Sequence, residues 1–345
     1  MQTLLLKPGP DAYSLASSLL RSGKLVAFPT ETVYGLGANA LDPDAVRSIF
    51  QAKGRPADNP LIVHIHDRNQ LDQICSVPDS AFPLMDAFWP GPLTILFEKK
   101  ESIPSVVTAD LPTVAVRMPS HPVAVAMLKA CGLPVAAPSA NSSGKPSPTT
   151  AQHVLEDMDG RIPLILDGGM CDVGLESTVL DLCHGNPTVL RPGGVTPEMI
   201  ESVLGVEIRL AGSILRPLKD NEVALSPGMR YKHYAPKASV TLVEGMEENV
   251  VPALRRLCLD SLRKGLKSCV LCFSEHMDAL SECYPHDIGS AQAPEEIAHC
   301  LFDTLRKLDE EQMEVVFSEV IPPDGIGLAV MNRLGRAAAF RTIHV

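Results

Sequence analysis

The first two-thirds of the chain alternates between segments with apolar residues at helical spacing and short apolar runs. In residues 11–22, Leu15, Leu19 and Leu20 fall on one face of a helix, and Gly23 follows as a typical helix end. The same spacing predicts helices over 43–51, 122–130 and 150–158. Short apolar runs predict strands over 25–28, 60–65, 93–97, 113–118, 135–138, 164–166, 177–182 and 188–190. Strands mixed with helices predict an α/β domain with a twisted sheet of mixed direction.

From residue 238 a second and more regular alternation begins. It predicts strands over 239–244, 268–273 and 315–319, and helices over 247–264, 294–309 and 327–339. Repetition of strand and helix at this spacing is typical of a small parallel, Rossmann-like sheet. The first of these strands is not followed by a G-x-G-x-x-G motif, so the pattern does not favour dinucleotide binding.

Residues 211–237 separate the two patterns and differ from both in composition. Two proline-containing turns, Ser226-Pro227-Gly228-Met229 and Ala235-Pro236-Lys237, bracket the stretch Tyr231-Lys232-His233-Tyr234. A flexible tether is typically rich in Gly and Ser, so we expect an ordered strap instead. The predicted organisation is a first domain over 1–212, a linker over 213–237 and a smaller second domain over 238–345.

Composition and charge narrow the function. A chain of 345 residues suits two domains, and its formal charge is −11. Of the 30 Lys and Arg and the 41 Asp and Glu, 12 of each lie in residues 1–150, which leaves 18 basic and 29 acidic residues in the rest. Duplex-binding proteins usually carry a basic excess, so small anionic substrates fit better than bulk nucleic acid.

The nine cysteines and the chain ends give expectations about location. Cys269 and Cys272 have the C-x-x-C spacing, but no second pair lies at the distance of a zinc site, and their surroundings predict a buried strand. No basic-then-apolar leader and no apolar run of 18 residues occurs in the sequence. We therefore expect a protein of the reducing cytoplasm without a membrane segment.

Two polar loops carry candidate phosphate-binding chemistry. Lys53-Gly54-Arg55 places an ammonium and a guanidinium beside a glycine that lets the backbone approach a ligand. Alternatively, these cations lie at a solvated helix end and offset its dipole. The loop 139–144, Ser-Ala-Asn-Ser-Ser-Gly, offers small hydroxyls and an amide directly after a strand. Its alternative interpretation is a polar turn that caps the next helix.

Single residues at strand ends add weaker signals. Arg117 ends an apolar strand and therefore requires a buried anionic partner from the protein or from a ligand. His64 also ends a strand, where a hydrogen-bonded core histidine is the simpler interpretation. The turn 30–35, Ser177 and Arg191 occupy similar positions. Cations, hydroxyls and glycines recur among these residues, and the sequence shows no obvious covalent nucleophile. The predicted chemistry is therefore adenylyl or phosphoryl transfer, in which the protein positions the reactants and stabilises charge.

Several short motifs, taken together, resemble the YrdC-type threonylcarbamoyl-AMP synthase family. In the first part they are Phe28-Pro29-Thr30-Glu31-Thr32-Val33-Tyr34-Gly35-Leu36-Gly37, Lys53-x-Arg55, Asp58-Asn59-Pro60-Leu61, Trp89-Pro90-Gly91-Pro92-Leu93-Thr94, Val116-Arg117-Met118-Pro119 and Ser139-x-Asn141. The longer, two-domain form of the family is indicated by Ser226-Pro227-Gly228-Met229 with His233-Tyr234-Ala235-Pro236, and by Gly325-Ile326-Gly327 with Met331-Asn332-Arg333. The resemblance implies a YrdC-like α/β domain followed by the Rossmann-like domain.

The resemblance also implies an activity and a set of site residues. The family makes threonylcarbamoyl-adenylate and pyrophosphate from L-threonine, bicarbonate and ATP. By resemblance, Lys53 and Arg55 are the catalytic residues. The implied ATP contacts are Arg55, Asn59, Thr113, Ser139, Asn141, Ser147, Arg191 and Tyr231. The implied threonine contacts are Thr32, His64, Arg117 and Ser177. Whether Tyr231 or Tyr234 lies over the nucleotide stays open.

Further expectations concern cofactor, lid and partners. Mg²⁺ is expected to arrive with ATP, held mainly by phosphate oxygens and water and not by a protein metal site. The strap 213–237 is expected to fold over the cleft as a lid that excludes water. The implied downstream partner is a transferase complex that moves the threonylcarbamoyl group to tRNA, and direct contact with tRNA stays open.

Two other functions fit parts of the sequence. One is an RNA-binding module of the tRNA-modification pathway, against which the acidic charge and the 4% aromatic content argue. The other is the carbamoyl-phosphate-handling domain of hydrogenase maturation proteins, which resembles the first domain. Such proteins carry zinc-finger and acylphosphatase segments that this sequence lacks.

Overall fold

The computed structural model describes residues 2–214, 216 and 234–345. The chain divides into two compact units. Among the described residues, the first unit comprises 2–143 and 147–214, and the second comprises 144–146, 216 and 234–345. Most of the predicted linker 213–237, Tyr231 included, lies outside the described residues.

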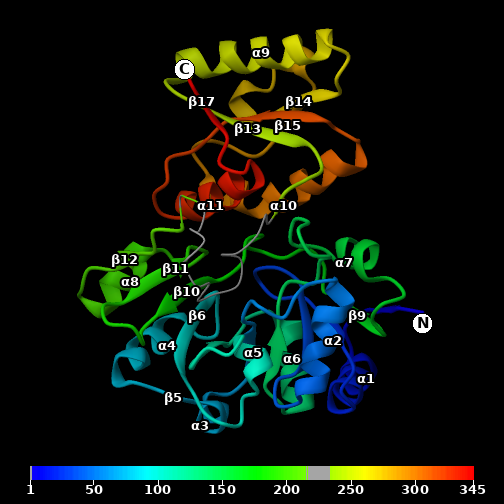
Figure 1. Cartoon of the computed structure of the whole chain (residues 1–345), viewed down its shortest axis with the longest axis vertical. Helices are drawn as coiled ribbons and strands as arrows, with labels where there is room; N and C mark the ends of the chain where they lie inside the picture. The colour runs from blue at the N-terminus through cyan, green and yellow to red at the C-terminus, as the bar shows by residue number, and fades with distance from the viewer. Residues whose placement is uncertain (1, 215, 217–233) are drawn as a thin grey trace. The chain divides into compact units, whose positions relative to one another are not determined.

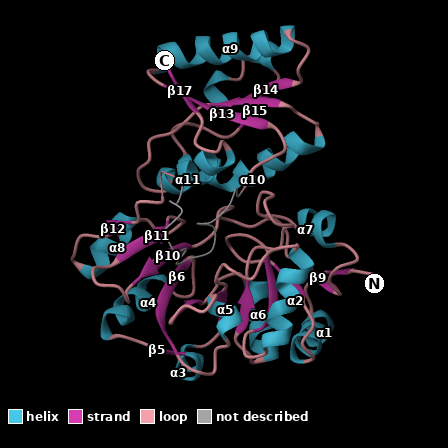
Figure 2. Cartoon of the chain, in the orientation of Figure 1, coloured by secondary structure: helices cyan, strands magenta, loops and turns pink. Residues whose placement is uncertain are grey.

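The first unit is built on a mixed sheet of twelve strands. They are β1 (Leu4–Leu6), β2 (Val26–Phe28), β3 (Gly35–Asn39), β4 (Ile62–His64), β5 (Cys75–Ser76), β6 (Leu93–Lys99), β7 (Thr113–Arg117), β8 (Val135–Ala137), β9 (Leu164–Leu166), β10 (Thr178–Asp181), β11 (Thr188–Arg191) and β12 (Arg209–Leu210). Their order is β1-β9-β2-β3-β8-β4-β7-β6-β10-β11-β12, and β5 pairs with β6. Figure 2 colours the strands magenta and the helices cyan. Since β4 is parallel to β7 but antiparallel to β8, the predicted mixed direction is confirmed.

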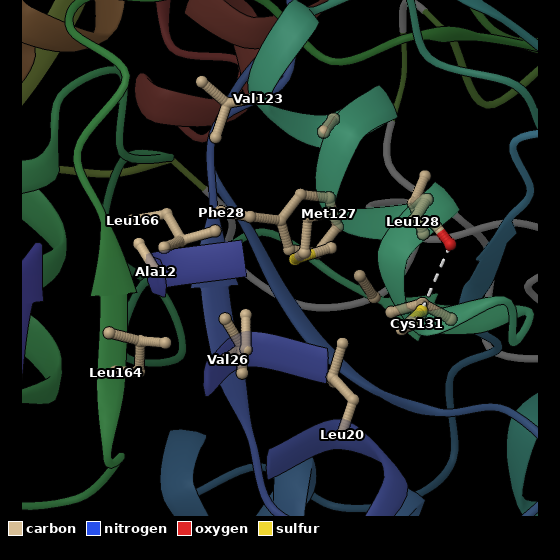
Figure 3. Packing of buried hydrophobic residues seen from close by; sticks show 14 residues of the cluster. Ala12, Leu20, Val26, Phe28, Val123, Met127, Leu128, Cys131, Leu164 and Leu166 are labelled. Atoms are coloured by element: carbon tan, nitrogen blue, oxygen red, sulfur yellow. Dashed lines mark hydrogen bonds between the residues drawn. The ribbon is translucent and has the colours of Figure 1, made fainter. Parts of the chain in front are cut away.

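Amphipathic helices cover this sheet. They are α1 (Pro10–Arg21), α2 (Pro43–Lys53), α3 (Leu71–Ile74), α4 (Phe82–Phe88), α5 (Ser105–Thr108), α6 (Pro122–Cys131), α7 (Ala151–Met158) and α8 (Pro197–Leu204), with 3₁₀ turns at Arg68–Gln70 and Asp79–Ala81. Figure 3 shows α1 and α6 packing together over β2 and β9, where Leu20, Phe28 and Met127 are fully buried. Apolar positions at helical spacing therefore build one continuous core with the sheet.

Strand β3 could not be predicted from side-chain alternation, because it contains Gly35 and Gly37. A Cβ atom at Gly37 would lie 2.8 Å from Val135 Cγ1 and 2.9 Å from Phe28 Cε1. The neighbouring strands β2 and β8 therefore approach β3 too closely for any side chain at this position.

The second unit is a five-stranded, wholly parallel sheet in the order β15-β14-β16-β13-β17. Its strands are β13 (Ser239–Glu244), β14 (Ser268–Cys272), β15 (Pro285–Asp287), β16 (Val315–Ser318) and β17 (Thr342–His344). Its helices are α9 (Glu247–Arg263), α10 (Pro294–Glu310) and α11 (Gly327–Ala337), with 3₁₀ turns at Ser274–His276 and Ser281–Cys283. Helix α9 covers one face, and α10 and α11 cover the other (Figure 1). The predicted Rossmann-like domain is confirmed.

The C-x-x-C motif, Cys269 and Cys272, lies in strand β14, and all five residues of this strand are buried. Burial raises the pKa of the Cys269 thiol to about 12 and that of Cys272 to about 12, so both are inert core residues. Within residues 2–214, 216 and 234–345, no helix is both long enough and apolar enough to cross a membrane.

Candidate active site

Lys53 organises the loop that carries the Ser139-x-Asn141 motif. It ends α2, and Gly54 follows in the left-handed conformation (φ 63°), which turns the chain out of the helix. The ammonium is buried and donates hydrogen bonds of 2.5 Å to the carbonyl oxygens of both Ser139 and Asn141. The Ser139 hydroxyl in turn donates to Asn141 Oδ1 at 2.5 Å. The lysine charge therefore fixes the backbone of the loop from within.

Three of the predicted ATP contacts meet at one edge of the sheet. Because Ile62 pairs with Ala115 in the parallel strands β4 and β7, Thr113 at the start of β7 is level with residue 60, next to Asn59. Because Ile62 also pairs with Ala137 in the antiparallel strand β8, Ser139 reaches the same level. Asn59 and Thr113 are both buried. The sheet thus gathers side chains that the sequence alone could only place one by one.

The turn 30–35 connects β2 to β3 and is buried throughout. The Thr30 hydroxyl oxygen accepts hydrogen bonds of 3.2 Å from the backbone amides of Thr32 and Val33, which fixes the turn. At its end, Gly35 forms a β-bridge with Ser139. The turn therefore lies directly against the motif loop that Lys53 holds.

Arg117 ends β7 and reaches back to the same turn. Its Nη1 donates to Thr32 Oγ1 at 2.8 Å, and its Nε donates to the Gly91 carbonyl at 3.2 Å. Its Nη2 lies 2.7 Å from Glu31 Oε1, in an ion pair whose side chains are 4% and 6% exposed. Glu31 is thus the anionic partner that a buried arginine requires.

The pair is charged in the folded protein. Burial alone would raise the pKa of the Glu31 carboxyl. The charge and hydrogen bonding of Arg117, aided by the backbone amide of Ser120, outweigh burial and hold that pKa below its usual value of 4.5. The Glu31 carboxylate therefore stays ionised beside the Arg117 guanidinium at neutral pH.

His64 is the cross-strand neighbour of Arg117 in β4. Its Nδ1 lies 3.2 Å from the Ile62 carbonyl, and its ring meets the Phe28 ring edge-on at 5.9 Å. Burial, assisted by the positive charge of Arg117, lowers the pKa of His64 to about 3, so the imidazole is neutral. A neutral ring has one donor nitrogen and one acceptor nitrogen but adds no charge to the site.

Ser177 and Arg191 form a second polar row beside Arg117. Thr94, which pairs with Arg117 across β6 and β7, has its hydroxyl 2.8 Å from the Ser177 hydroxyl. Arg191 donates to the Ser177 carbonyl from Nε and to the Ser177 hydroxyl from Nη2, both at 3.1 Å. A second buried guanidinium is therefore fixed next to one of the predicted threonine contacts.

Ser147 joins this row through Glu176. The Ser147 hydroxyl donates to Glu176 Oε1 at 2.5 Å, and both side chains are buried. A Cβ atom at Gly193 would lie 2.4 Å from the Thr178 nitrogen and 2.5 Å from the Glu176 carbonyl oxygen. The chain after Arg191 therefore packs directly on the backbone that carries Glu176.

The other residues predicted to contact ATP include Arg55 and one of the two tyrosines Tyr231 and Tyr234. The Arg55 guanidinium donates to the Asn59 carbonyl at 3.4 Å and lies 5.9 Å from the centre of the Phe50 ring. Tyr231 is outside the described residues. Tyr234 is buried in the second unit, where its ring lies 5.2 Å from that of Phe302.

Sequence reasoning missed the roles of three buried polar side chains: Glu31, Thr94 and Glu176. A signal existed for Thr94, because a fully buried hydroxyl interrupts the apolar run Leu93–Phe97. For Glu31 the signal was that Arg117 needs a buried anionic partner. Which carboxylate reaches Arg117 depends on strand register, and the sequence does not give that register.

Taken together, the site offers cations, hydroxyls and amide groups around a buried turn. Such groups bind and orient anions without forming covalent intermediates. Among the described residues, no group of three or more His, Cys, Asp and Glu side chains is arranged to hold a metal ion.

Comparisons with known proteins agree with this two-part organisation. A family model described as "Telomere recombination", which covers Sua5, YciO and YrdC proteins, matches residues 18–193. A second model, "Threonylcarbamoyl-AMP synthase, C-terminal domain", matches residues 195–339. The threonylcarbamoyl-AMP synthases of Pyrococcus abyssi and Bacillus subtilis are 48% and 47% identical, over 96% and 95% of this chain and 95% and 93% of theirs. The crystal structure of Pyrococcus abyssi Sua5 with L-threonine superposes with a TM-score of 0.92, at 46% identity over the whole of both chains.

Proposed function

This chain belongs to the threonylcarbamoyl-AMP synthase family, and from that premise we propose that it joins L-threonine, bicarbonate and ATP into threonylcarbamoyl-AMP. The threonine amine combines with bicarbonate to give a carbamate and water. A carbamate oxygen then attacks the α-phosphorus of ATP, the bond to the β-phosphate breaks, and pyrophosphate leaves. The enzyme is thus a nucleotidyltransferase that works by placement and electrostatics.

The observation that carries the proposal is the buried turn 30–35, which touches both groups of candidate residues. Through Thr32 and Glu31 it contacts Arg117, and through Gly35 it pairs with Ser139. A ligand bound at Arg117 and a ligand bound at the motif loop would therefore share one wall. That arrangement suits a reaction that joins an amino-acid derivative to a nucleotide.

We assign the threonine carboxylate to Arg117. A guanidinium has five N–H donors, and the contacts with Gly91, Thr32 and Glu31 leave at least two of them for a ligand. Glu31 holds the arginine in place at the same time, so the arginine is pre-oriented before the substrate arrives. The neutral His64 and the Ser177 hydroxyl are the proposed neighbours of the amino acid.

We assign ATP to the edge formed by Asn59, Thr113 and Ser139, with Arg55 and Arg191 as its cations. Both reactants are anions, so part of the barrier is their mutual repulsion, which these charges relieve. Lys53 acts as a positioning residue within this assignment, because its ammonium is bound to the carbonyl oxygens of Ser139 and Asn141. We propose that Mg²⁺ enters with the nucleotide, ligated by phosphate oxygens and water.

The chemical reactivity of the product indicates which reaction must follow and where in the cell it takes place. A mixed anhydride between a carbamate and AMP is an activated acyl donor that hydrolyses readily, so it requires a prompt acceptor. We propose that a tRNA-modifying threonylcarbamoyl transferase complex is that acceptor system. Since ATP and tRNA meet in the cytoplasm, we place the reaction there.

The direct test is to incubate the full chain with ATP, radiolabelled bicarbonate and L-threonine and to follow labelled threonylcarbamoyl-AMP together with pyrophosphate. We expect both products in equal amounts, and neither when L-threonine is omitted. Arg55→Ala and Lys53→Ala are expected to abolish product formation. Pyrophosphate release without a labelled adenylate would refute the proposed reaction.

A matched control separates lost chemistry from lost folding. Arg47 also lies on α2, but its side chain is 56% exposed and paired with the exposed Asp44. Arg47→Ala should leave the product yield unchanged. Thermal unfolding of all three variants identifies any loss of fold, and Lys53→Ala is the one at risk because its ammonium is buried. Unchanged turnover in both Arg55→Ala and Lys53→Ala would sink the site assignment.

A further inference from the structure

The second unit has a position at which parallel α/β sheets bind ligands. Strands β13 and β16 are neighbours, yet the chain leaves them in opposite directions. From β13 it crosses through α9 to β14, and from β16 it crosses through α11 to β17 on the other side. These helices lie on opposite faces of the sheet (Figure 1). In parallel sheets this arrangement leaves a crevice at the carboxyl ends of the two strands, where ligands bind.

A cavity of about 260 Å³ occupies this crevice. Its walls come from the segments that follow three adjacent strands: Val243 and Val250 near β13 and α9, Phe273 after β14, and Val320 after β16. The first three of these side chains are almost fully buried. An apolar floor with a few convergent polar groups is the usual character of a small-molecule site.

The polar groups of the cavity centre on His276. Its Nδ1 lies 2.7 Å from Glu319 Oε1, and its Nε2 lies 3.2 Å from Glu247 Oε1. The other Glu319 oxygen accepts a hydrogen bond of 2.7 Å from the Phe273 amide. Burial opposes protonation of His276, but the two carboxylates raise its pKa above the usual value. The pKa of Glu319 lies above its usual value, because burial outweighs the opposing effect of its contacts with Phe273 and His276.

The charge of the lining is unbalanced. A third carboxylate, Glu275, is exposed at the rim, where the Ser290 hydroxyl donates to it at 2.5 Å. Three carboxylates thus face a single histidine, and the lining residues include neither lysine nor arginine. The N-terminus of α9 would by itself favour an anion, but Glu247 and Glu248 already occupy its first turn.

We infer that this cavity binds a small organic cation, an ammonium group on a short aliphatic body. The ammonium would approach Glu319 and Glu247, whose carboxylates use only part of their acceptor capacity in the contacts above. The aliphatic part would lie against Val243, Val250 and Phe273. This site is independent of the proposed synthase reaction, because every residue that forms it belongs to the second unit.

Three probes of similar size test the charge preference directly: butylammonium, butanol and butyrate. The full chain, labelled with carbon-13 at histidine, is titrated with each probe while the His276 imidazole signals are followed by NMR. We expect a saturable shift with butylammonium, a weaker response to butanol and none to butyrate. Saturation by butyrate as strong as that by butylammonium, or no saturable shift with butylammonium, would overturn the inference.

Variants test the residues. Glu319→Gln removes a buried charge-assisted contact and is expected to weaken butylammonium binding at least about tenfold. Glu247 is largely exposed, so Glu247→Gln is expected to weaken binding only about two- to fivefold. Glu248→Gln is the matched control, because it removes the same charge from the same first turn of α9 but does not line the cavity. The Glu247 side chain is 83% exposed, so that variant stays informative even if Glu319→Gln unfolds. Full affinity in Glu247→Gln, or an equal loss in Glu248→Gln, would contradict the site.

Discussion

The buried ion pair between Glu31 and Arg117 allows a quantitative test of the site. In Glu31→Gln the arginine keeps its contacts with Thr32 and Gly91 but loses its counter-charge inside the protein. Removal of one partner from a buried pair typically costs about 3–5 kcal/mol, because the remaining charge is left desolvated. The glutamine still offers an amide oxygen to Arg117, so we expect the lower end, about 3 kcal/mol.

The single tryptophan makes this loss measurable in a two-domain chain. Trp89 belongs to the first unit, is 5% exposed, and donates its indole N–H to the Leu93 carbonyl at 2.7 Å. Its fluorescence therefore reports on the first unit. A signal from one unit is useful because chains of several domains often do not unfold in a single two-state transition. Urea unfolding followed at Trp89 should give a midpoint shift that corresponds to the predicted free energy.

A surface ion pair of nearly the same length provides the control. Arg68 and Asp86 lie 2.6 Å apart, compared with 2.7 Å in the buried pair, but their side chains are 37% and 70% exposed. Asp86→Asn should cost no more than about 1 kcal/mol, since water screens and solvates both charges. If Glu31→Gln cost no more than Asp86→Asn, burial would not be what makes the site pair strong, and the reasoning would be wrong.

Three further predictions use the same fluorescence assay or simple thiol chemistry. The folded-state pKa of Glu31 lies below its usual 4.5, so its contribution to the free energy of unfolding is complete above pH 4.5 and is lost as the pH falls below that value. Urea unfolding at acidic pH should therefore show a smaller difference in stability between wild type and Glu31→Gln. A difference that stays constant with pH would count against the ion pair. Gly37→Ala would put a methyl group 2.8 Å from Val135 Cγ1 and should destabilise the first unit by about 1–3 kcal/mol, as measured at Trp89. Of nine free cysteines only Cys183 and Cys300 are half-buried, so a thiol reagent should modify at most two in the native protein and nine after unfolding; more than two fast-reacting thiols would contradict the described core.

Regular patterns in the sequence predicted the elements that bury one face. Helices α1, α2, α6 and α10 and most of the interior strands of both sheets were predicted, because apolar spacing directly reflects burial. Strands β1 and β17 were missed, since edge strands of three residues carry too few side chains for a period. Strand β3 was missed for another reason, the tight approach of its neighbours to Gly37.

The candidate site shows where sequence reasoning stops. It identified Arg117 as a residue that needs an anion, because a cation at the end of an apolar strand is costly by itself. It could not name Glu31, since that contact depends on a turn folding back across the sheet. It placed Lys53 in a phosphate-binding loop, which stays a prediction. The structure adds that the Lys53 ammonium donates to the carbonyl oxygens of Ser139 and Asn141.

The shared turn 30–35 has a thermodynamic consequence for the proposed reaction. One end of it contacts Arg117 and the other pairs with Ser139. A shift of the turn that one ligand causes at its own end would therefore change the free energy with which the other ligand binds. On the proposed function, the affinities for L-threonine and ATP are then linked. Linkage is reciprocal: the factor by which ATP alters the affinity for threonine equals the factor by which threonine alters the affinity for ATP. If that factor favours binding, a backbone segment of six residues would make the enzyme respond to the joint supply of both substrates.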